Sequence, residues 1–142
     1  MKKTFKAVIS IVLGLTLIGC QTSDSETAMN KVESINGSLM YRERFALPDD
    51  AVVTVTLSDV SLADAPAKIL TSQQFETRGA QVPFNFELLY DQSQIDSRHT
   101  YTVSARIEVN GRLRFITDTR YPVITDDRET EKVNLQLIGV KG

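Results

Sequence analysis

A chain of 142 residues with 42% hydrophobic and 24% charged residues has the composition of one globular domain, and indicates neither a disordered chain nor a polytopic membrane protein. Three of its 16 Lys and Arg lie at the extreme N-terminus. The other 13 stand against 18 Asp and Glu, a formal net charge of −5 that argues against nucleic acid as a partner. Cys20 is the only cysteine, so no intrachain disulfide can form.

An N-terminal leader is the first predicted element. Lys2, Lys3 and Lys6 form a basic segment, and the apolar run 7–18 that follows is about a dozen residues long, where a membrane-spanning helix needs roughly 20. We therefore predict a cleaved signal peptide over residues 1–19.

The apolar run ends in Leu17-Ile18-Gly19-Cys20, which resembles the lipobox of bacterial lipoproteins: an aliphatic residue three positions before a cysteine, then small residues. The resemblance implies that the Cys20 thiol receives a diacylglycerol group, that signal peptidase II cuts between Gly19 and Cys20, and that the new amine is acylated. Several acyl chains make such an anchor permanent, because one chain alone binds a membrane only marginally. The alternative is an ordinary signal peptide in which the cysteine falls there by chance.

Residues 20–31 are predicted to form the lipidated N-terminus and a flexible tether, because they contain almost no apolar side chains. Gln21 follows the cysteine, whereas an Asp at this position marks inner-membrane retention in enterobacterial lipoproteins. By this resemblance we expect anchoring in the outer membrane with the domain in the periplasm, and inner-membrane retention is the alternative.

From residue 32 onward the apolar residues recur at every second position, and no stretch supports a long amphipathic helix. This period predicts an all-β domain over residues 32–142, a single small antiparallel β-sandwich of about seven strands. The strands are expected near 35–41, 53–57, 68–75, 84–90, 101–107, 113–115 and 133–137.

Two of these strands have a distinct character. The segment 68–75 alternates only weakly, which is typical of an edge strand. The segment 84–90 places Phe84, Phe86, Leu88 and Tyr90 on one face and is expected in the core. Elsewhere, 91–98 is expected to make a helical turn, and Pro122 to interrupt the β pattern.

Asn110-Gly111 predicts a hairpin turn. The packing of the two flanking strands distinguishes between two possible pairing registers. A two-residue type I′ turn would put apolar residues of one strand on the same face as arginines of the next. A three-residue loop, with Gly111 in the left-handed position of a G1 bulge, would set Ile107 against Leu113 and Ala105 against Phe115. We therefore predict the three-residue loop.

This register would place Arg106 opposite Arg114 on the outer face, with Glu108 and Arg112 beside them. Like charges directly opposite one another are unfavourable unless something compensates them. A carboxylate from a neighbouring strand is the ordinary compensation; an anionic ligand or a partner peptide is the other. Arg106, Arg112 and Arg114 are thus a candidate partner-binding or anion-binding face.

A family resemblance covers roughly residues 35–140. The segments that carry it are Tyr41-Arg42-Glu43-Arg44, Ala46-Leu47-Pro48, Val52-Val53-Thr54-Val55, Leu57-Ser58-Asp59-Val60-Ser61, Asp64-Ala65-Pro66, Gln81-Val82-Pro83-Phe84, Ser104-Ala105-Arg106-Ile107, Phe115-Ile116-Thr117-Asp118-Thr119 and Tyr121-Pro122-Val123. Together they resemble the YbaY/YscW-type lipoprotein domain. The resemblance implies a compact β-sandwich related to the pilotins, which bind secretin subunits of type III secretion systems and help them reach the outer membrane.

No residue pattern indicates an enzyme, a cofactor or a metal site. The single histidine, His99, has no nucleophile-elbow or other catalytic signature near it and is expected to pack in a loop or lie on the surface. The acidic segment 126–131 lacks the Gly-punctuated spacing of a calcium loop and is expected to be a solvated turn.

Two functional hypotheses from different classes follow. The first is a non-catalytic binding module that offers a sheet edge or an apolar groove to a partner segment. A pilotin-like chaperone of an outer-membrane secretin would be one such module. The alternative is a general cell-envelope lipoprotein with a structural, anionic-ligand or glycan-binding role. The sequence contains no Trp, which weakens the case for a sugar-stacking platform.

Overall fold

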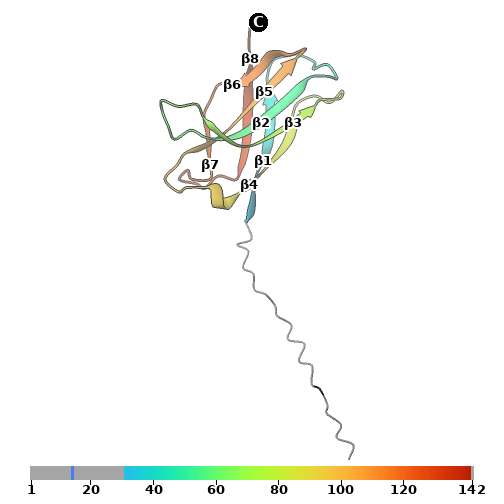
Figure 1. The fold of residues 1–142 in the computed structure, drawn as a ribbon. Helices are drawn as coiled ribbons and strands as arrows, with labels where there is room; N and C mark the ends of the chain where they lie inside the picture. Colours follow the sequence, from blue (N-terminus) through green and yellow to red (C-terminus); the bar gives the residue numbers. More distant parts are fainter. Residues whose placement is uncertain (1–13, 15–30, 142) are drawn as a thin grey trace, which may run out of the picture.

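The structure, a computed structural model, describes residue 14 and residues 31–141 (Figure 1). Within 31–141 the chain forms eight strands and one short 3₁₀ helix, in the order β1 (Val32–Tyr41), β2 (Val52–Asp59), β3 (Lys68–Glu76), β4 (Phe84–Asp91), η1 (Gln92–Gln94), β5 (Tyr101–Val109), β6 (Arg112–Thr117), β7 (Tyr121–Val123) and β8 (Lys132–Gly139). In this part of the chain no helix is long and apolar enough to cross a membrane.

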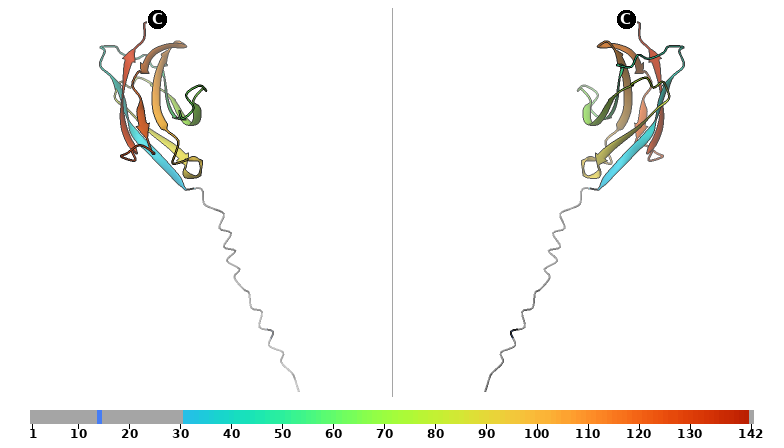
Figure 2. Two further views of the ribbon diagram at one scale, coloured as in Figure 1. Left: turned by 90° about the vertical axis from the view of Figure 1, so that its left-hand side faces the viewer. Right: turned by 90° about the vertical axis from the view of Figure 1, so that its right-hand side faces the viewer.

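The strands form one strongly curved sheet. Its order is β3-β2-β5-β6-β8-β1-β4, and β7 pairs with the end of β5 that β6 leaves open. The sheet curls until it is nearly closed into a barrel-like sandwich, which brings its two ends near each other (Figure 2). The predicted all-β class is confirmed, and β3 is an edge strand as predicted.

The core lies between the two halves of the curled sheet, and the alternation of the sequence fills it. Phe84, Phe86, Leu88 and Tyr90 all point inward from β4 and are buried, as predicted. Because successive strand residues face opposite sides, each strand contributes every second side chain to this core. One end of the core is closed by aromatic stacking, in which the Tyr41 ring lies parallel to Phe115 with centroids 3.9 Å apart.

One strand pair is parallel, whereas an antiparallel sandwich is predicted from the sequence. β1 and β8 are parallel, with Gly37 beside Val133, whereas the other pairs of the described sheet are antiparallel. Alternation shows which face of a strand is buried but carries no information about its neighbour's direction.

The predicted register of the β5–β6 hairpin is wrong. Asn110 and Gly111 both have positive φ, 52° and 73°, which is the signature of the two-residue type I′ turn. Val109 therefore pairs with Arg112, and Glu108 pairs with Leu113. A β-bulge further along β6 adds one residue, so that the next pair is Ile107 with Phe115. The bulge returns Phe115 to the core, and so solves the packing problem that had argued against the short turn.

The segment around Pro122 was also predicted incorrectly. Tyr121–Val123 forms the short strand β7, in which Pro122 lies opposite Thr102 of β5. Proline is tolerated there because β7 is peripheral and its missing N–H interrupts no central ladder. The helical turn expected within 91–98 is present as η1, and the Asp91 carboxylate caps it by accepting from Ser93 N at 2.8 Å.

Candidate partner-binding site

The structure tests the predicted site residues unevenly. Gly19 and Cys20, the proposed cleavage and lipidation positions, lie outside the described residues. The three arginines of the proposed binding face do not converge: Arg106 Nε pairs with Glu108 on its own strand at 3.1 Å, Arg114 stacks over the Phe45 ring with its Cζ 4.5 Å from the centroid, and Arg112 lies exposed at the hairpin. Arg106 is opposite Ile116 rather than Arg114, so the proposed like-charge pair does not form. Anion binding at these residues stays an untested prediction.

The most distinctive surface feature is the seam, by which we mean the line along which the edge strands β3 and β4 approach each other. No backbone ladder joins the two strands among the described residues. Side chains bridge them instead: Gln73 Oε1 accepts from Glu87 N at 3.1 Å, and the Phe75 and Phe84 rings meet edge to face with centroids 5.7 Å apart. The barrel is therefore closed here by side chains. Apart from the Glu87 amide, which Gln73 occupies, no backbone group of either strand has a hydrogen-bond partner across the seam in the described part of the chain, and such edges can pair with another chain.

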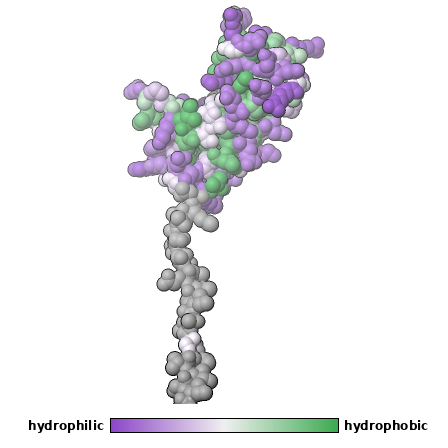
Figure 3. Space-filling view, turned by 45° about the vertical axis from the view of Figure 1, so that its right-hand side comes forward, coloured by the Kyte–Doolittle hydropathy of each residue, from purple (hydrophilic) through white to green (hydrophobic). Residues whose placement is uncertain are grey.

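Each of the two edge strands also exposes one large apolar side chain. Ile69 on β3 is 63% exposed and Leu89 on β4 is 54% exposed, high values for residues in regular strands. Figure 3, in which the right-hand side of Figure 1 comes forward, shows apolar patches interspersed with polar surface. Two open cavities adjoin the edge strands. One, of about 660 Å³, is lined by residues that include Gln73 and Asn85, and the other, of about 600 Å³, is lined by residues that include Phe75. Apolar surface beside unpaired strand edges is the combination that partner segments use.

His99 belongs to a hydrogen-bonded loop cluster at the start of β5. Its Nδ1 lies 2.6 Å from Asp59 Oδ2, and its Nε2 lies 3.8 Å from Asp96 Oδ2. The Ser61 hydroxyl donates to Asp59 and not to the His99 imidazole. Ser61, His99 and Asp59 are therefore not arranged as a serine nucleophile activated by a histidine base. The Ser61 hydroxyl is also the main cause that lowers the pKa of Asp59, against the opposing effect of burial. The geometry is that of a structural clasp between two loops.

A pH titration tests the neighbouring ion pair between Asp96 and Arg98, which lie in one loop. The side chain of Arg98, which pairs with Asp96 at 3.0 Å, lowers the pKa of Asp96 to about 2. Because this folded-state pKa is depressed, the interaction stabilises the fold above the unfolded value of about 4 and is lost as the pH falls through about 2. NMR titration of the Asp96 carboxyl should show a midpoint near 2, and Arg98→Ala should raise it toward the unfolded value. An unchanged midpoint in Arg98→Ala contradicts the assigned pairing.

A small all-β domain with an incompletely closed sheet, exposed apolar side chains along its seam and a lipobox-like leader is the kind expected of an envelope binding module. The comparisons specify the family. The model of the family described as type III secretion system lipoprotein chaperone (YscW) matches residues 30–137, and the chain belongs to that family. The predicted resemblance is confirmed.

Two known proteins are similar over most of the chain. The uncharacterized lipoprotein YbaY of Escherichia coli (strain K12) is 42% identical over 122 residues, which are 84% of this chain and 63% of YbaY, so the chain spans less than two thirds of that relative. The solved structure of an alternative pilotin from the type II secretion system of Vibrio cholerae is 62% identical, with a TM-score of 0.77. That match covers 79% of this chain and all of the pilotin chain.

Sequence reasoning found the edge character of β3 but missed the seam. The weak alternation of 68–75 was a usable signal for an edge. That β4 forms the opposite edge could not be read from its sequence, because its aromatic inner face is that of a central strand. Only the strand order shows that the two strands are the open ends of one sheet.

Proposed function

We propose that this chain is a pilotin-like lipoprotein that binds an outer-membrane secretin through its β-domain. The observation that carries the proposal is the match to the Vibrio cholerae pilotin, because identity of 62% extends over the whole of that chain. The membership in a family of secretion-system lipoprotein chaperones points to the same class of function. Fold alone would not suffice, since one fold hosts many functions.

The proposed anchor is the lipid on Cys20. Signal peptidase II would cut after Gly19, residues 20–31 would form the tether, and Gln21 would permit transport to the outer membrane. A lipid anchor and a secretin-binding domain on one chain would couple the partner's position to the membrane. The periplasmic domain needs no chemistry for this role; it needs a surface that holds a partner segment while the lipid determines where the complex goes.

The proposed binding surface is the seam. A partner segment that adds to the free edge of β3 or β4 gains backbone hydrogen bonds, and apolar side chains of the same segment can cover Ile69 and Leu89. Gln73 now occupies the Glu87 amide, at 3.1 Å, and a partner carbonyl could replace it. The other predicted mode, a helix in an apolar groove, would use the same exposed side chains without the backbone pairing.

Recovery of a secretin tests the proposal. The lipidated protein is isolated under mild detergent from cells that make secretins, after in-cell crosslinking, and bound proteins are identified by mass spectrometry. We expect a secretin subunit among the crosslinked partners. Recovery of lipid or lipopolysaccharide without a secretin would contradict the proposal and favour the general envelope role.

A further inference from the structure

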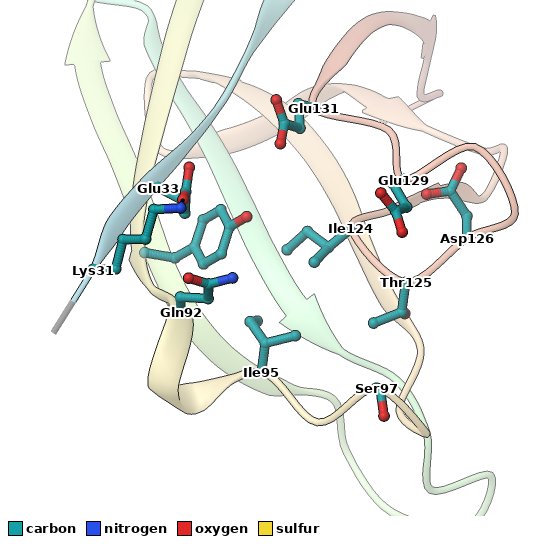
Figure 4. A pocket seen from close by; sticks show the side chains of 11 residues that line it. Lys31, Glu33, Gln92, Ile95, Ser97, Ile124, Thr125, Asp126, Glu129 and Glu131 are labelled. Carbon is teal, nitrogen blue, oxygen red and sulfur yellow. Dashed lines mark ion pairs between the residues drawn. The ribbon is translucent and has the colours of Figure 1, made fainter.

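A second site lies at the end of the barrel where residue 31 enters β1. Three segments, residues 31–33, 90–97 and 124–131, surround an open cavity of about 610 Å³, called the cup below (Figure 4). We propose that the cup binds an organic cation, an ammonium or guanidinium group on an aliphatic stem. This site is separate from the seam and does not depend on whether a secretin binds there.

Backbone hydrogen bonds hold the three walls of the cup together. Gln92 N donates to Lys31 O at 3.0 Å, and Asn36 N donates to Glu131 O at 2.9 Å, so β1 is fixed to both other segments. Within the third wall, the Asp126 carboxylate accepts from Thr130 N at 2.7 Å. The cup is therefore formed by tied segments, and its side chains need little ordering when a ligand binds.

Tyr90 is the observation that points to a ligand. Its side chain lines the cup and is only 7% exposed. The other three tyrosine hydroxyls, of Tyr41, Tyr101 and Tyr121, each have a hydrogen-bond partner, whereas that of Tyr90 has none among the described residues. No fully buried polar side-chain atom in this part of the chain lacks a partner, which is consistent with a Tyr90 hydroxyl that faces the open space of the cup. A largely buried tyrosine usually satisfies its hydroxyl, and this one is left for a ligand.

The charge around the hydroxyl is negative. Glu33, Asp126, Glu129 and Glu131 line the cup, and of the described residues that line it Lys31 alone is a cation. Lys31 is already paired with Glu33 at 2.8 Å, while Glu129 and Glu131 have no ion-pair partner within residues 31–141. Burial, and then the nearby carboxylates of Glu33 and Glu131, raise the pKa of Tyr90, so its hydroxyl shares the electrostatic environment of the acidic rim.

The shape and chemistry favour an organic cation over a metal ion. No three carboxylates of the described residues come close enough to hold a metal. Ile95 and Ile124 point into the cup from two walls, which suits the aliphatic stem of a lysine-like or arginine-like group (Figure 4). An ammonium or guanidinium group has several N–H donors, enough for the Tyr90 hydroxyl and for carboxylates on two sides.

Binding of small cations to the lipidated protein in detergent micelles tests the proposal. Agmatine and cadaverine represent free cations, and N-acetyl-arginine amide represents the side chain of a bound polypeptide; each is titrated by calorimetry and by NMR. At least one should bind and shift the signals of Ile95, Ile124 and Tyr90. Preference for the free amines indicates a small cation as the ligand, and preference for the peptide-like probe indicates a protein side chain.

Single substitutions distinguish the cup from general attraction to an acidic protein. Tyr90→Phe keeps the ring and removes the hydroxyl, so it should weaken binding about fivefold, and Glu131→Gln should weaken it about tenfold. Glu76→Gln is the matched control, because it removes one exposed carboxylate at the end of β3, outside the lining of the cup, and should leave binding unchanged. No binding of any probe, or equal loss in Glu76→Gln, overturns the proposal.

Discussion

Replacement of Cys20 by alanine is expected to remove all fatty-acid labelling from the protein. Cys20 is the only thiol in the chain, so no second residue can accept the diacylglycerol group. Without the lipidated cysteine, signal peptidase II should also leave the leader uncut, so the protein should keep residues 1–19 and migrate as a larger species. Metabolic labelling with an alkyne fatty acid, followed by gel electrophoresis of the protein, measures both effects.

Thr22→Ala is the matched control for this prediction, since it lies two positions from the cysteine and should leave labelling intact. Labelling that persists in Cys20→Ala would show that the lipobox resemblance is misleading and that the leader is an ordinary signal peptide.

The largest effect on stability is expected from Gly37→Ala. A Cβ atom at this position would lie 1.7 Å from Val133 O and 2.8 Å from Val133 C, both backbone atoms of the parallel neighbour β8. A backbone carbonyl cannot rotate away as a side chain can, so the β1–β8 pair must separate. Since overpacking of a well-packed interior typically costs 1–3 kcal/mol, we expect about 3 kcal/mol of lost unfolding free energy. Urea denaturation followed by circular dichroism measures it.

Gly139→Ala is a control of the same chemistry at the other end of β8. Its Cβ would meet no atom closer than Glu43 Oε1 at 3.4 Å, the end of a flexible side chain, so the change should stay within about 0.5 kcal/mol. If Gly37→Ala were as stable as Gly139→Ala, β1 and β8 could not pair as described.

Local patterns predicted the faces of the strands but not their neighbours. The alternation of Tyr101, Val103, Ala105 and Ile107 identified the inner face of β5, because side-chain period is a property of a single strand. The β5–β6 register failed for a different reason. Apolar residues and arginines are expected on opposite faces of a strand, but this rule fixes the register only when the ladder is continuous. The bulge in β6 changes the register within the strand.

The binding surfaces were less accessible to sequence reasoning than the fold. The seam exists because β3 and β4 are the two ends of one sheet, and the sequence of neither strand predicts the strand order. The cup combines residues as distant as Glu33 and Glu131. The acidic segment 126–131 is predicted to be a solvated turn because it lacks the spacing of a calcium loop, and that local pattern does not show that Tyr90 lines the same cavity. Such sites depend on long-range contacts, which local propensity does not encode.

Binding of a secretin segment along the seam, as proposed above, can be tested by site-specific photocrosslinking in cells. A photoreactive residue at position 89 lies on β4 beside the seam, while one at position 62 lies in the exposed β2–β3 loop and serves as the control. We expect a secretin adduct from position 89 and little or none from position 62. An adduct from position 62 alone, or no secretin adduct from either position, would contradict binding along the seam.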